Sequence, residues 1–391
     1  MKRVVVGLSG GVDSSVSAYL LKQQGYEVIG IFMKNWHDEN VTISNECPWI
    51  DDSNDALLVA NQLNIPFQVI DLSKEYKERI VDYMFNEYKS GRTPNPDVLC
   101  NREIKFDVFL KAAENLGADF LATGHYCRKT TLENGYFGLL NGKDPSKDQS
   151  YFLCQLSQQQ LSKALFPIGN MLKSEVRSIA LEQGLITAEK KDSQGLCFVG
   201  KISLPIFLQQ KLKQKNGNII EIDSSNTQLK TYHQINPIID NIEALSSPFR
   251  FSESDGIKVA DHIGAHYYTV GQRKGLHIGG RPLPSFVIQI DTETNTVFSG
   301  QSDSHPGLNR WALKIAGEDL HYLRPGIQFS ETPTLLMARI RYRQALKECQ
   351  LIKIKSDYFV LFKEIQRGIT PGQFAAFYID SELVASGVIQ S

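Results

Sequence analysis

The segment Gly7-Leu8-Ser9-Gly10-Gly11-Val12-Asp13-Ser14-Ser15 joins an apolar, β-branched run, Arg3–Leu8, to a stretch with helical periodicity, Val12–Gln24. Glycines let the backbone approach a ligand closely and adopt positive φ angles. The free N–H groups at a helix start, with the positive end of the helix dipole, form an anion site. The serine hydroxyls add further donors. The segment therefore predicts a phosphate-binding loop between the first strand and the first helix of an α/β fold.

Strand-like and helix-like runs go on alternating through the first half of the chain. Further strands are expected at Glu27–Met33, Pro66–Asp71 and Phe120–Thr123, and helices at Asp51–Leu63, Lys74–Lys89 and Ile104–Leu116. This order predicts a doubly wound parallel sheet, with its ligand site at the carboxyl ends of the strands.

The pattern changes after about residue 200. Asn216–Ser254 is polar and weakly periodic, so we expect a linker region there with an insertion near 224–254. Gly271–Gly280 is a glycine-rich basic loop. From Ser285 onward, short β-rich runs separated by turn residues predict an antiparallel β-barrel. The expected domains are an α/β domain, a small mixed central domain and the barrel, over residues 1–200, 201–283 and 284–391.

The composition is that of a globular protein, because 42% of the 391 residues are hydrophobic and 22% are charged. The net charge of -1 means that a nucleic-acid partner would need a local basic face. No apolar run is long enough to cross a membrane. Met1–Gly7 has neither the apolar region nor the cleavage site of a secretory signal. We therefore expect a cytoplasmic protein with no membrane partner.

Three known loop motifs, two that bind nucleotides and one from hydrolases, can be tested against Gly7–Ser15. The loop lacks the Gly-Lys-Ser/Thr ending of the usual P-loop and does not match Gly-x-Gly-x-x-Gly. Gly7–Gly11 matches Gly-x-Ser-x-Gly, the nucleophile elbow of serine hydrolases, but an elbow on the first strand has no upstream oxyanion loop. The string Ser9–Ser15 instead resembles the signature of enzymes that split ATP between its α- and β-phosphates and leave AMP on the substrate.

Two of the six cysteines have charged settings. Cys100 comes just before the helix expected near Ile104, beside Arg102 and Lys105, and both features lower the pKa of a thiol. This setting favours a thiolate nucleophile. Asp97 is close enough in sequence to act as an acid or base, or to hold a substrate base.

Cys197 follows Lys190-Lys191 and Gly195, which indicates an exposed electropositive loop. The cysteines expected to be small buried hydrophobes are Cys47, Cys127, Cys154 and Cys349. None of the six forms a Cys-x-x-Cys pair, so we expect no zinc ribbon or other protein metal site.

Basic residues gather near the C-terminal end of the chain. Met337–Ser356 contains six of them against one acid, Glu348: Arg339, Arg341, Arg343, Lys347, Lys353 and Lys355. Such a cluster is either a phosphate-binding face or a solvated strand. Tyr342 is either a platform for a base or a core residue of the barrel. His125, after a strand end, is either a ligand or a satisfied polar residue.

Taken together, these strings resemble the tRNA-specific 2-thiouridylase family (MnmA/TrmU). The matching strings are Ser9–Ser15, Phe32–Trp36, Gly91–Asp97, Leu99–Phe106, Ala122–Tyr126, Lys147–Leu153, Lys191–Ser193, Gly195 with Cys197-Phe198, Gly271–Leu276 and Arg341–Gln344. They span nearly the whole chain in one order. The 224–254 segment looks like an insertion relative to shorter members, which leaves the chemistry untouched but bears on tRNA contacts and partner docking there.

The resemblance implies a role for each matching residue. ATP, with Mg²⁺, would be bound by Gly7, Leu8, Ser9, Gly10, Gly11, Val12, Asp13, Ser14, Met33 and Gly124. The catalytic residues would be Cys100 as nucleophile, Cys197 as persulfide carrier and Asp97. The residues in contact with tRNA would be Asn95, Pro96, Asp97, His125, Lys147, Asp148, Gln149, Arg341, Tyr342 and Gln373. The partners implied are tRNAs for Lys, Glu and Gln and a persulfide donor or relay protein.

The chemistry needs these parts because the C2 carbonyl of uridine is a poor electrophile with a poor leaving group. Adenylation of its oxygen lets AMP depart, and a persulfide on Cys197 supplies a strong sulfur nucleophile. The terminal sulfur either attacks C2 directly or is released after attack by the Cys100 thiolate. Either route would end in a Cys100–Cys197 disulfide that a reductant opens. Two alternatives remain besides the hydrolase: another AMP-forming pyrophosphate-loop synthetase, which would need no paired thiols, and a non-catalytic nucleotide-binding module.

Overall fold

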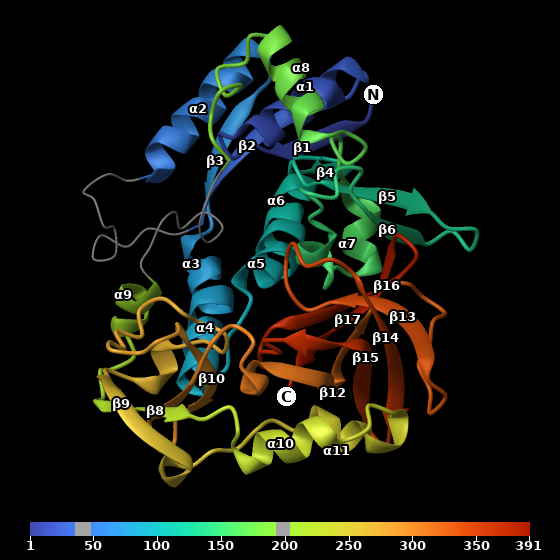
Figure 1. Cartoon of the computed structure of the whole chain (residues 1–391). Coiled ribbons are helices and arrows are strands. Elements are labelled where there is room, and N and C mark those ends of the chain that lie inside the picture. Colours follow the sequence, from blue (N-terminus) through green and yellow to red (C-terminus); the bar gives the residue numbers. More distant parts are fainter. Residues whose placement is uncertain (36–47, 193–203) are drawn as a thin grey trace.

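The computed structural model describes residues 1–35, 48–192 and 204–391. Figure 1 shows the N-terminal parallel sheet at the top, with a four-stranded sheet and a β-barrel beside each other below it. Helices descend from the parallel sheet toward the other two. Among the described residues, no helix is both long enough and apolar enough to cross a membrane.

The parallel sheet has the strand order β3-β2-β1-β4-β7, with every pairing parallel. Its strands are β1 (Arg3–Gly7), β2 (Glu27–Lys34), β3 (Phe67–Asp71), β4 (Phe120–Ala122) and β7 (Ala164–Leu165). One face packs against α1 (Val12–Gln23), α2 (Pro48–Gln62) and α8 (Lys173–Glu182), through residues such as Val16, Val59 and Val176. The opposite face packs against the descending helices. Helices on both faces confirm the doubly wound fold.

Each descending helix contains one wide, π-helical section. The first consists of α3 (Ser73–Tyr76), η1 (Lys77–Val81) and α4 (Asp82–Lys89). The second consists of α5 (Pro96–Leu99), η2 (Cys100–Val108) and α6 (Phe109–Asn115). This second helix begins at Pro96 rather than near Ile104, because the Asn95 side chain caps it and Pro96 suits the first helical position.

Six antiparallel strands form the barrel, in the order β12-β15-β14-β13-β16-β17, and pairing of β12 with β17 closes it. The strands are β12 (Asn309–Tyr322), β13 (Thr334–Arg339), β14 (Lys347–Ile354), β15 (Asp357–Arg367), β16 (Phe374–Ile379) and β17 (Glu382–Ile389). A hairpin of β5 (Cys127–Thr131) and β6 (Phe137–Asn141) extends this sheet from β17. The N-terminal half of the chain is thus joined to the barrel. Two short helices, η3 (Ser150–Leu153) and α7 (Gln158–Lys163), follow the hairpin.

The four-stranded sheet has the order β10-β11-β8-β9. Its strands are β8 (Gly217–Ile222), β9 (Gly256–His262), β10 (Ser285–Asp291) and β11 (Thr296–Gln301), and only β8 and β11 pair in parallel. The runs Phe286–Ile290 and Thr296–Ser299, expected in the barrel, therefore belong to this sheet. Burial of Val287 and Val297 in its core explains that pairing. The three domain boundaries stay a prediction.

The segment expected as a linker is folded. It contains β8, α10 (Thr227–Gln234), η4 (Ile239–Asn241), α11 (Ile242–Ser246) and η5 (Glu253–Asp255). Leu229 and Leu245 from its helices pack with Phe359 and Leu361 of the barrel strand β15. The apolar residues of this segment show no clear helical or strand period in the sequence. They nevertheless cover the outside of the barrel. The other short helices are α9 (Leu204–Gln209), η6 (Ala265–Tyr267) and η7 (Pro306–Leu308).

Candidate active site

The loop between β1 and α1 has the open helix start that its sequence predicts. Gly11 is the N-cap residue, and within the described residues no side chain caps α1. Ser14 organises the loop from within: its Oγ accepts from the Ser9 N–H at 3.2 Å and donates to the Gly11 carbonyl at 3.0 Å. The side chains of Leu8 and Val12 are buried. The loop therefore presents backbone N–H groups and serine hydroxyls, which suit a phosphate.

Two glycines shape this cradle. Gly10 has a φ of 70°, and a Cβ there would lie 2.2 Å from the carbonyl oxygen of Asp52 in α2. Gly124 follows β4, and a Cβ there would lie 2.9 Å from the backbone nitrogen of Ser14. Any larger residue at either position would displace the loop. Met33, on the neighbouring strand, is buried with its methyl 3.6 Å from the Cβ position of Gly7.

Asp13 is held by two residues from distant parts of the chain. The Tyr126 hydroxyl donates to its Oδ1 at 2.7 Å, and Lys173 Nζ contacts both carboxylate oxygens at 2.7 and 2.9 Å. Burial raises the pKa of Tyr126, and the Asp13 carboxylate raises it further, so this phenol stays a hydrogen-bond donor. A lysine side chain that is only 11% exposed thus lies at the phosphate loop.

The same lysine connects Asp13 to a second carboxylate. Lys173 Nζ lies 2.8 Å from Asp192, which also pairs with Lys147 at 2.7 Å and Arg177 at 3.1 Å. Burial raises the pKa of Asp192, but the hydrogen bonds from Lys147 and Lys173 outweigh it and bring the value to about 2. Three cations thus surround Asp192, and with the carboxylates of Asp13 and Asp144 they form a network of paired charges beside the loop.

Sequence reasoning missed Lys173 and Tyr126 as members of this site. Lys173 is the first residue of α8, where a cation opposes the helix dipole. That unfavourable position is the one local signal that would have singled it out. Lys190, expected in an exposed electropositive loop, pairs with Asp52 at 2.7 Å and Asp55 at 2.5 Å, both in α2.

Cys100 occupies the second turn of its helix rather than a position before it. Asn95 Oδ1 accepts from the Val98 N–H at 3.2 Å, which fixes the helix start one turn earlier. The Asn101 amide donates to the carbonyl of Asp97 at 3.0 Å and to that of Phe152 at 3.1 Å. Asp97 and Cys100 are three residues apart and so share one face of this helix.

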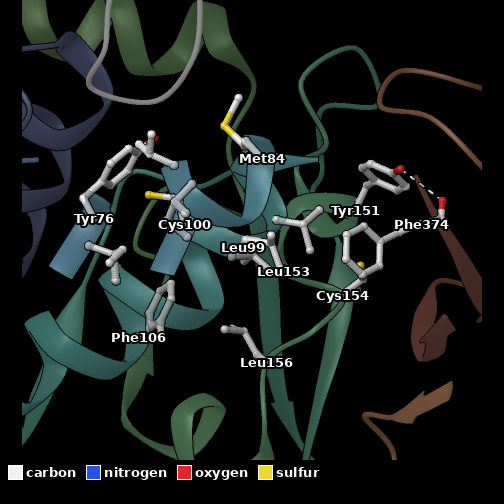
Figure 2. Packing of buried hydrophobic residues seen from close by; sticks show 14 of the residues in the cluster. Tyr76, Met84, Leu99, Cys100, Phe106, Tyr151, Leu153, Cys154, Leu156 and Phe374 are labelled. Carbon is white, nitrogen blue, oxygen red and sulfur yellow. Dashed lines mark hydrogen bonds between the residues drawn. The ribbon is translucent and has the colours of Figure 1, made fainter. Parts of the chain in front are cut away.

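The Cys100 side chain is fully buried. It lies next to Tyr76, in the cluster that also contains Leu99 and Phe106 (Figure 2). The residues of this cluster are hydrophobic, and the charged setting expected for the Cys100 thiol stays a prediction. Cys197 lies outside the described residues, as does Cys47, so the pairing of Cys100 with Cys197 stays a prediction.

Three other cysteines are buried, as expected. Cys127, Cys154 and Cys349 are free thiols in the interior. Burial raises the pKa of each, to about 12 for Cys154. These thiols are therefore poor nucleophiles at neutral pH.

Gln373 ties the 91–97 loop to the barrel. Its amide donates to the carbonyls of Thr93 at 2.9 Å and Pro94 at 3.0 Å, and its oxygen accepts from Asn95 at 3.2 Å. Two of the residues expected to contact tRNA, Asn95 and Gln373, are thus brought together although they are 278 positions apart in the chain.

An aromatic contact leads from this loop to the surface of the barrel. The rings of Phe152 and Tyr342 have centroids 4.3 Å apart, and the Arg343 guanidinium lies 5.2 Å from the Tyr342 ring. The half-buried Tyr342 is therefore a surface platform rather than part of the barrel core. Asn101 binds the carbonyl of Phe152, so the platform adjoins the Cys100 turn.

Two arginines beside this platform lack acidic partners. Arg341 donates to the carbonyl of Arg367 at 2.6 Å. Burial lowers the pKa of Arg341, and the Arg367 charge lowers it further. No carboxylate among residues 1–35, 48–192 and 204–391 pairs with either guanidinium. Two close positive charges of this kind favour a bound anion.

The other basic residues of the 337–356 cluster are less available. Arg339 pairs with Asp148 at 2.9 Å, with both side chains buried. Lys347 pairs with Glu364 at 2.6 Å, and Lys353 lies over the Tyr358 ring. Among the described residues, the members of the cluster without an acidic partner are therefore Arg341 and Arg343, which flank Tyr342, together with Lys353 and Lys355.

The remaining residues expected to contact tRNA differ in exposure. Lys147 and Gln149 are half-buried, and the Gln149 side chain accepts from the Tyr126 N–H at 3.0 Å. Asp148 is 5% exposed and accepts from Gly142 and Ser150 as well as Arg339. His125 is 8% exposed, bonded to Thr123 at 2.7 Å. Burial and then the Lys105 charge lower the pKa of His125 well below its usual value.

Comparison with protein families covers most of the chain. A family model described as "tRNA methyl transferase HUP domain" matches residues 2–201, "tRNA methyl transferase PRC-barrel domain" matches residues 246–301 and "Aminomethyltransferase beta-barrel domain" matches residues 313–389.

Curated relatives match from end to end. The protein named tRNA-specific 2-thiouridylase MnmA from Christiangramia forsetii is 60% identical over 394 residues, which is 100% of both chains. The protein of the same name from Flavobacterium johnsoniae is 59% identical over 394 residues, again 100% of both. A third, from Karelsulcia muelleri, is 46% identical over 391 residues, or 99% of this chain and 98% of that protein. This chain belongs to the tRNA-specific 2-thiouridylase family.

Proposed function

We propose that this protein is an ATP-dependent tRNA sulfurtransferase that replaces the C2 oxygen of the wobble uridine with sulfur. One observation carries the proposal: direct contacts join the Cys100 helix to the Tyr342 platform, and Phe109 of the same helix lies 3.3 Å from the Cβ position of Gly7 in the phosphate loop. Asn101 links the Cys100 turn to Phe152, which contacts Tyr342. Gln373 links the loop before Cys100 to the same end of the barrel. Full-length relatives named for 2-thiolation support this assignment.

The β1–α1 loop is suited to the triphosphate of ATP. Its residues Gly7–Ser14 present backbone N–H groups, and Lys173 adds a cation at its edge. Mg²⁺ carried by the triphosphate would offset more of its charge. The chemistry that ATP supplies is an adenylyl group on the C2 oxygen, with diphosphate released. Met33 and Gly124 flank the loop at the carboxyl ends of β2 and β4, where an adenine nucleotide fits.

The sulfur steps use the two cysteines in sequence. The terminal sulfur of a Cys197 persulfide attacks C2, and AMP leaves with the former C2 oxygen. The Cys100 thiolate then attacks the Cys197 sulfur, which breaks the S–S bond and leaves 2-thiouridine. A Cys100–Cys197 disulfide remains, and a thiol reductant supplies the two electrons that open it. Asp97, on the Cys100 face of the helix, would hold the base or move its proton.

Transfer RNA would lie across the end of the barrel. Tyr342 offers a ring for base stacking, and Arg341 and Arg343 offer phosphate contacts. Asn95 and Pro96 start the Cys100 helix and would face the everted base. Lys147 and Gln149 are accessible enough for direct contact, whereas the buried Asp148 and His125 would act by positioning their neighbours. The tRNAs for Lys, Glu and Gln, a persulfide relay partner and a cytoplasmic location complete the proposal.

Two other reactions, methyl transfer and AMP-forming synthesis, have less support than thiolation. The family models are described by methyl transfer, but their descriptions name single domains, whereas the relatives named for thiolation match the entire chain. An AMP-forming synthetase would use the same phosphate loop. It would have no need of Cys100 or of an aromatic platform joined to the Cys100 turn.

The test is mass spectrometry of nucleosides from tRNA incubated with the protein, ATP, Mg²⁺ and a persulfide source. We expect 2-thiouridine that requires ATP and disappears in Cys100→Ser. Cys154→Ala is the matched control, since Cys154 is also a buried thiol. AMP formation without a thiolated nucleoside would refute thiolation and favour the synthetase.

A further inference from the structure

Asn35 is a buried side chain whose hydrogen bonds are missing. It directly follows β2, and its side chain is 1% exposed. Neither Oδ1 nor Nδ2 has a hydrogen-bond partner in the part of the chain that the structure describes. A buried amide without partners opposes folding, so natural proteins rarely keep one without a reason.

Asn295 shows how the same chain treats a buried asparagine elsewhere. Its Nδ2 donates to the carbonyls of Lys215 at 3.0 Å and Asn216 at 2.9 Å, and its Oδ1 accepts from Ala265 at 3.0 Å. That amide is as deeply enclosed, at 4% exposure, but fully satisfied. The contrast indicates that the partners of Asn35 come from a ligand.

The position of Asn35 relates it to the phosphate loop. β2 lies between β1 and β3, with Gly7 opposite Ile31, so both β1 and β2 end at the same edge of the sheet. Asn35 comes two residues after Met33, whose methyl lies 3.6 Å from the Cβ position of Gly7. In doubly wound folds a nucleotide lies along this edge. With the triphosphate on the β1–α1 loop, the base would lie over the neighbouring strand.

We propose that the Asn35 carboxamide recognises the adenine of ATP. Its oxygen accepts from the 6-amino group and its NH₂ donates to the adjacent ring nitrogen, which is the bidentate pairing that asparagine makes with adenine. The inference rests on the proposed ATP-dependent function. It adds a residue that distinguishes adenine from other bases, whereas the loop residues bind only the phosphates.

The test separates binding of the base from binding of the phosphates. Isothermal titration calorimetry would compare α,β-methylene-ATP, which cannot be cleaved between those phosphates, with inorganic tripolyphosphate, which has no base. Asn35→Leu should weaken the analogue about 10- to 100-fold, the loss expected for one bidentate base contact. Its affinity for tripolyphosphate should not change. Asn35→Asp, which loses the donor, should weaken the analogue similarly.

Thermal unfolding without nucleotide gives a second readout. Asn35→Leu should melt at the same temperature as the wild type or higher, because an apolar side chain removes an unsatisfied amide. Asn134→Leu is the control for the analogue titration, since Asn134 lies in the exposed turn of the β5–β6 hairpin. It should leave binding of α,β-methylene-ATP unchanged.

Wild-type affinity of both Asn35 variants for α,β-methylene-ATP would overturn the inference. If 2-thiouridine formation were lost at the same time, the amide would meet the target base instead of adenine. Failure of the proposed function looks different: the wild type would prefer α,β-methylene-ATP to tripolyphosphate, lose that preference in Asn35→Leu and yet form no 2-thiouridine.

Discussion

The Nζ atom of Lys173 lies 2.7 Å from Oδ1 and 2.9 Å from Oδ2 of Asp13, although the residues are 160 positions apart in the chain. The pair places a cation at the one carboxylate within the phosphate loop. Without it, Asp13 would repel an incoming triphosphate. Helix α8 therefore completes a site that the β1–α1 segment begins.

Lys173→Met is expected to reduce the rate of AMP formation on tRNA about 100-fold, as loss of a preorganised charge partner does in other active sites. Lys173→Arg should recover part of the rate. Lys143→Met is the matched control, because Lys143 pairs with Glu175 of the same helix but this pair is exposed. Rates are measured as AMP released per enzyme. Wild-type AMP formation by Lys173→Met would contradict the role given to this lysine.

Arg341 and Arg367 should both contribute to binding of tRNA. Arg367→Gln is expected to weaken binding and to lower the slope of log K against log salt by about one phosphate contact. Filter binding at several salt concentrations measures this slope. Lys363→Gln serves as the control, because Lys363 already pairs with Glu348. An unchanged slope in Arg367→Gln would place the tRNA backbone elsewhere.

The Asp192 carboxylate should contribute a pH-dependent part of the stability. Its pKa of about 2 lies below the unfolded value of about 3.9, so its contribution is present above pH 4 and declines as the pH falls toward 2. Because the side chain is 39% exposed, solvent screening limits this contribution to about 1 kcal/mol.

Urea unfolding of wild type and Asp192→Asn between pH 6 and pH 3 measures that contribution. The difference in the free energy of unfolding should fall by about half over this range, as the pKa values of about 2 and 3.9 require. A difference that stays constant to pH 3 would show that the lysine partners do not lower the pKa of Asp192.

Local sequence signals were sufficient for the fold of the N-terminal half. The β-branched run of β1 and the glycine loop predicted a parallel sheet with a phosphate site; the sheet is present, and α1 starts without a side-chain cap, as such a site requires. The same signals misplaced the start of the Cys100 helix, because Asn95 caps it about two turns before Ile104. In a sequence, an asparagine between two prolines is harder to recognise as the cap of a helix than a cluster of charged residues is to notice.

Contacts between distant segments were beyond reach of the sequence. The Gln373 contacts with the 93–95 loop depend on how the barrel docks against the helix, which no local period encodes. The exposure of the basic residues at 337–356 depends on the same docking. Arg339 alternates with the barrel-core residue Ala338, so its side chain leaves the barrel and is buried against Asp148, whereas the arginines in the turn after β13 are exposed.

The buried pair of Arg339 and Asp148 gives the sharpest stability prediction. Both side chains are less than a tenth exposed, and their atoms lie 2.9 Å apart. Arg339→Met leaves the Asp148 charge without its counterion, so the free energy of unfolding should fall by about 3–5 kcal/mol. Adding Asp148→Asn removes that charge while its oxygen still accepts from Gly142 and Ser150.

The double variant should therefore be more stable than Arg339→Met alone. A second substitution restores stability in this way only if an unpaired buried charge caused the loss. Chemical denaturation of the wild type, both single variants and the double variant measures the coupling. Lys347→Met, which breaks an exposed pair on the same barrel, should cost less than about 1 kcal/mol. If the double variant were as unstable as Arg339→Met, lost packing of the arginine over the Tyr378 ring would be the cause rather than the buried charge.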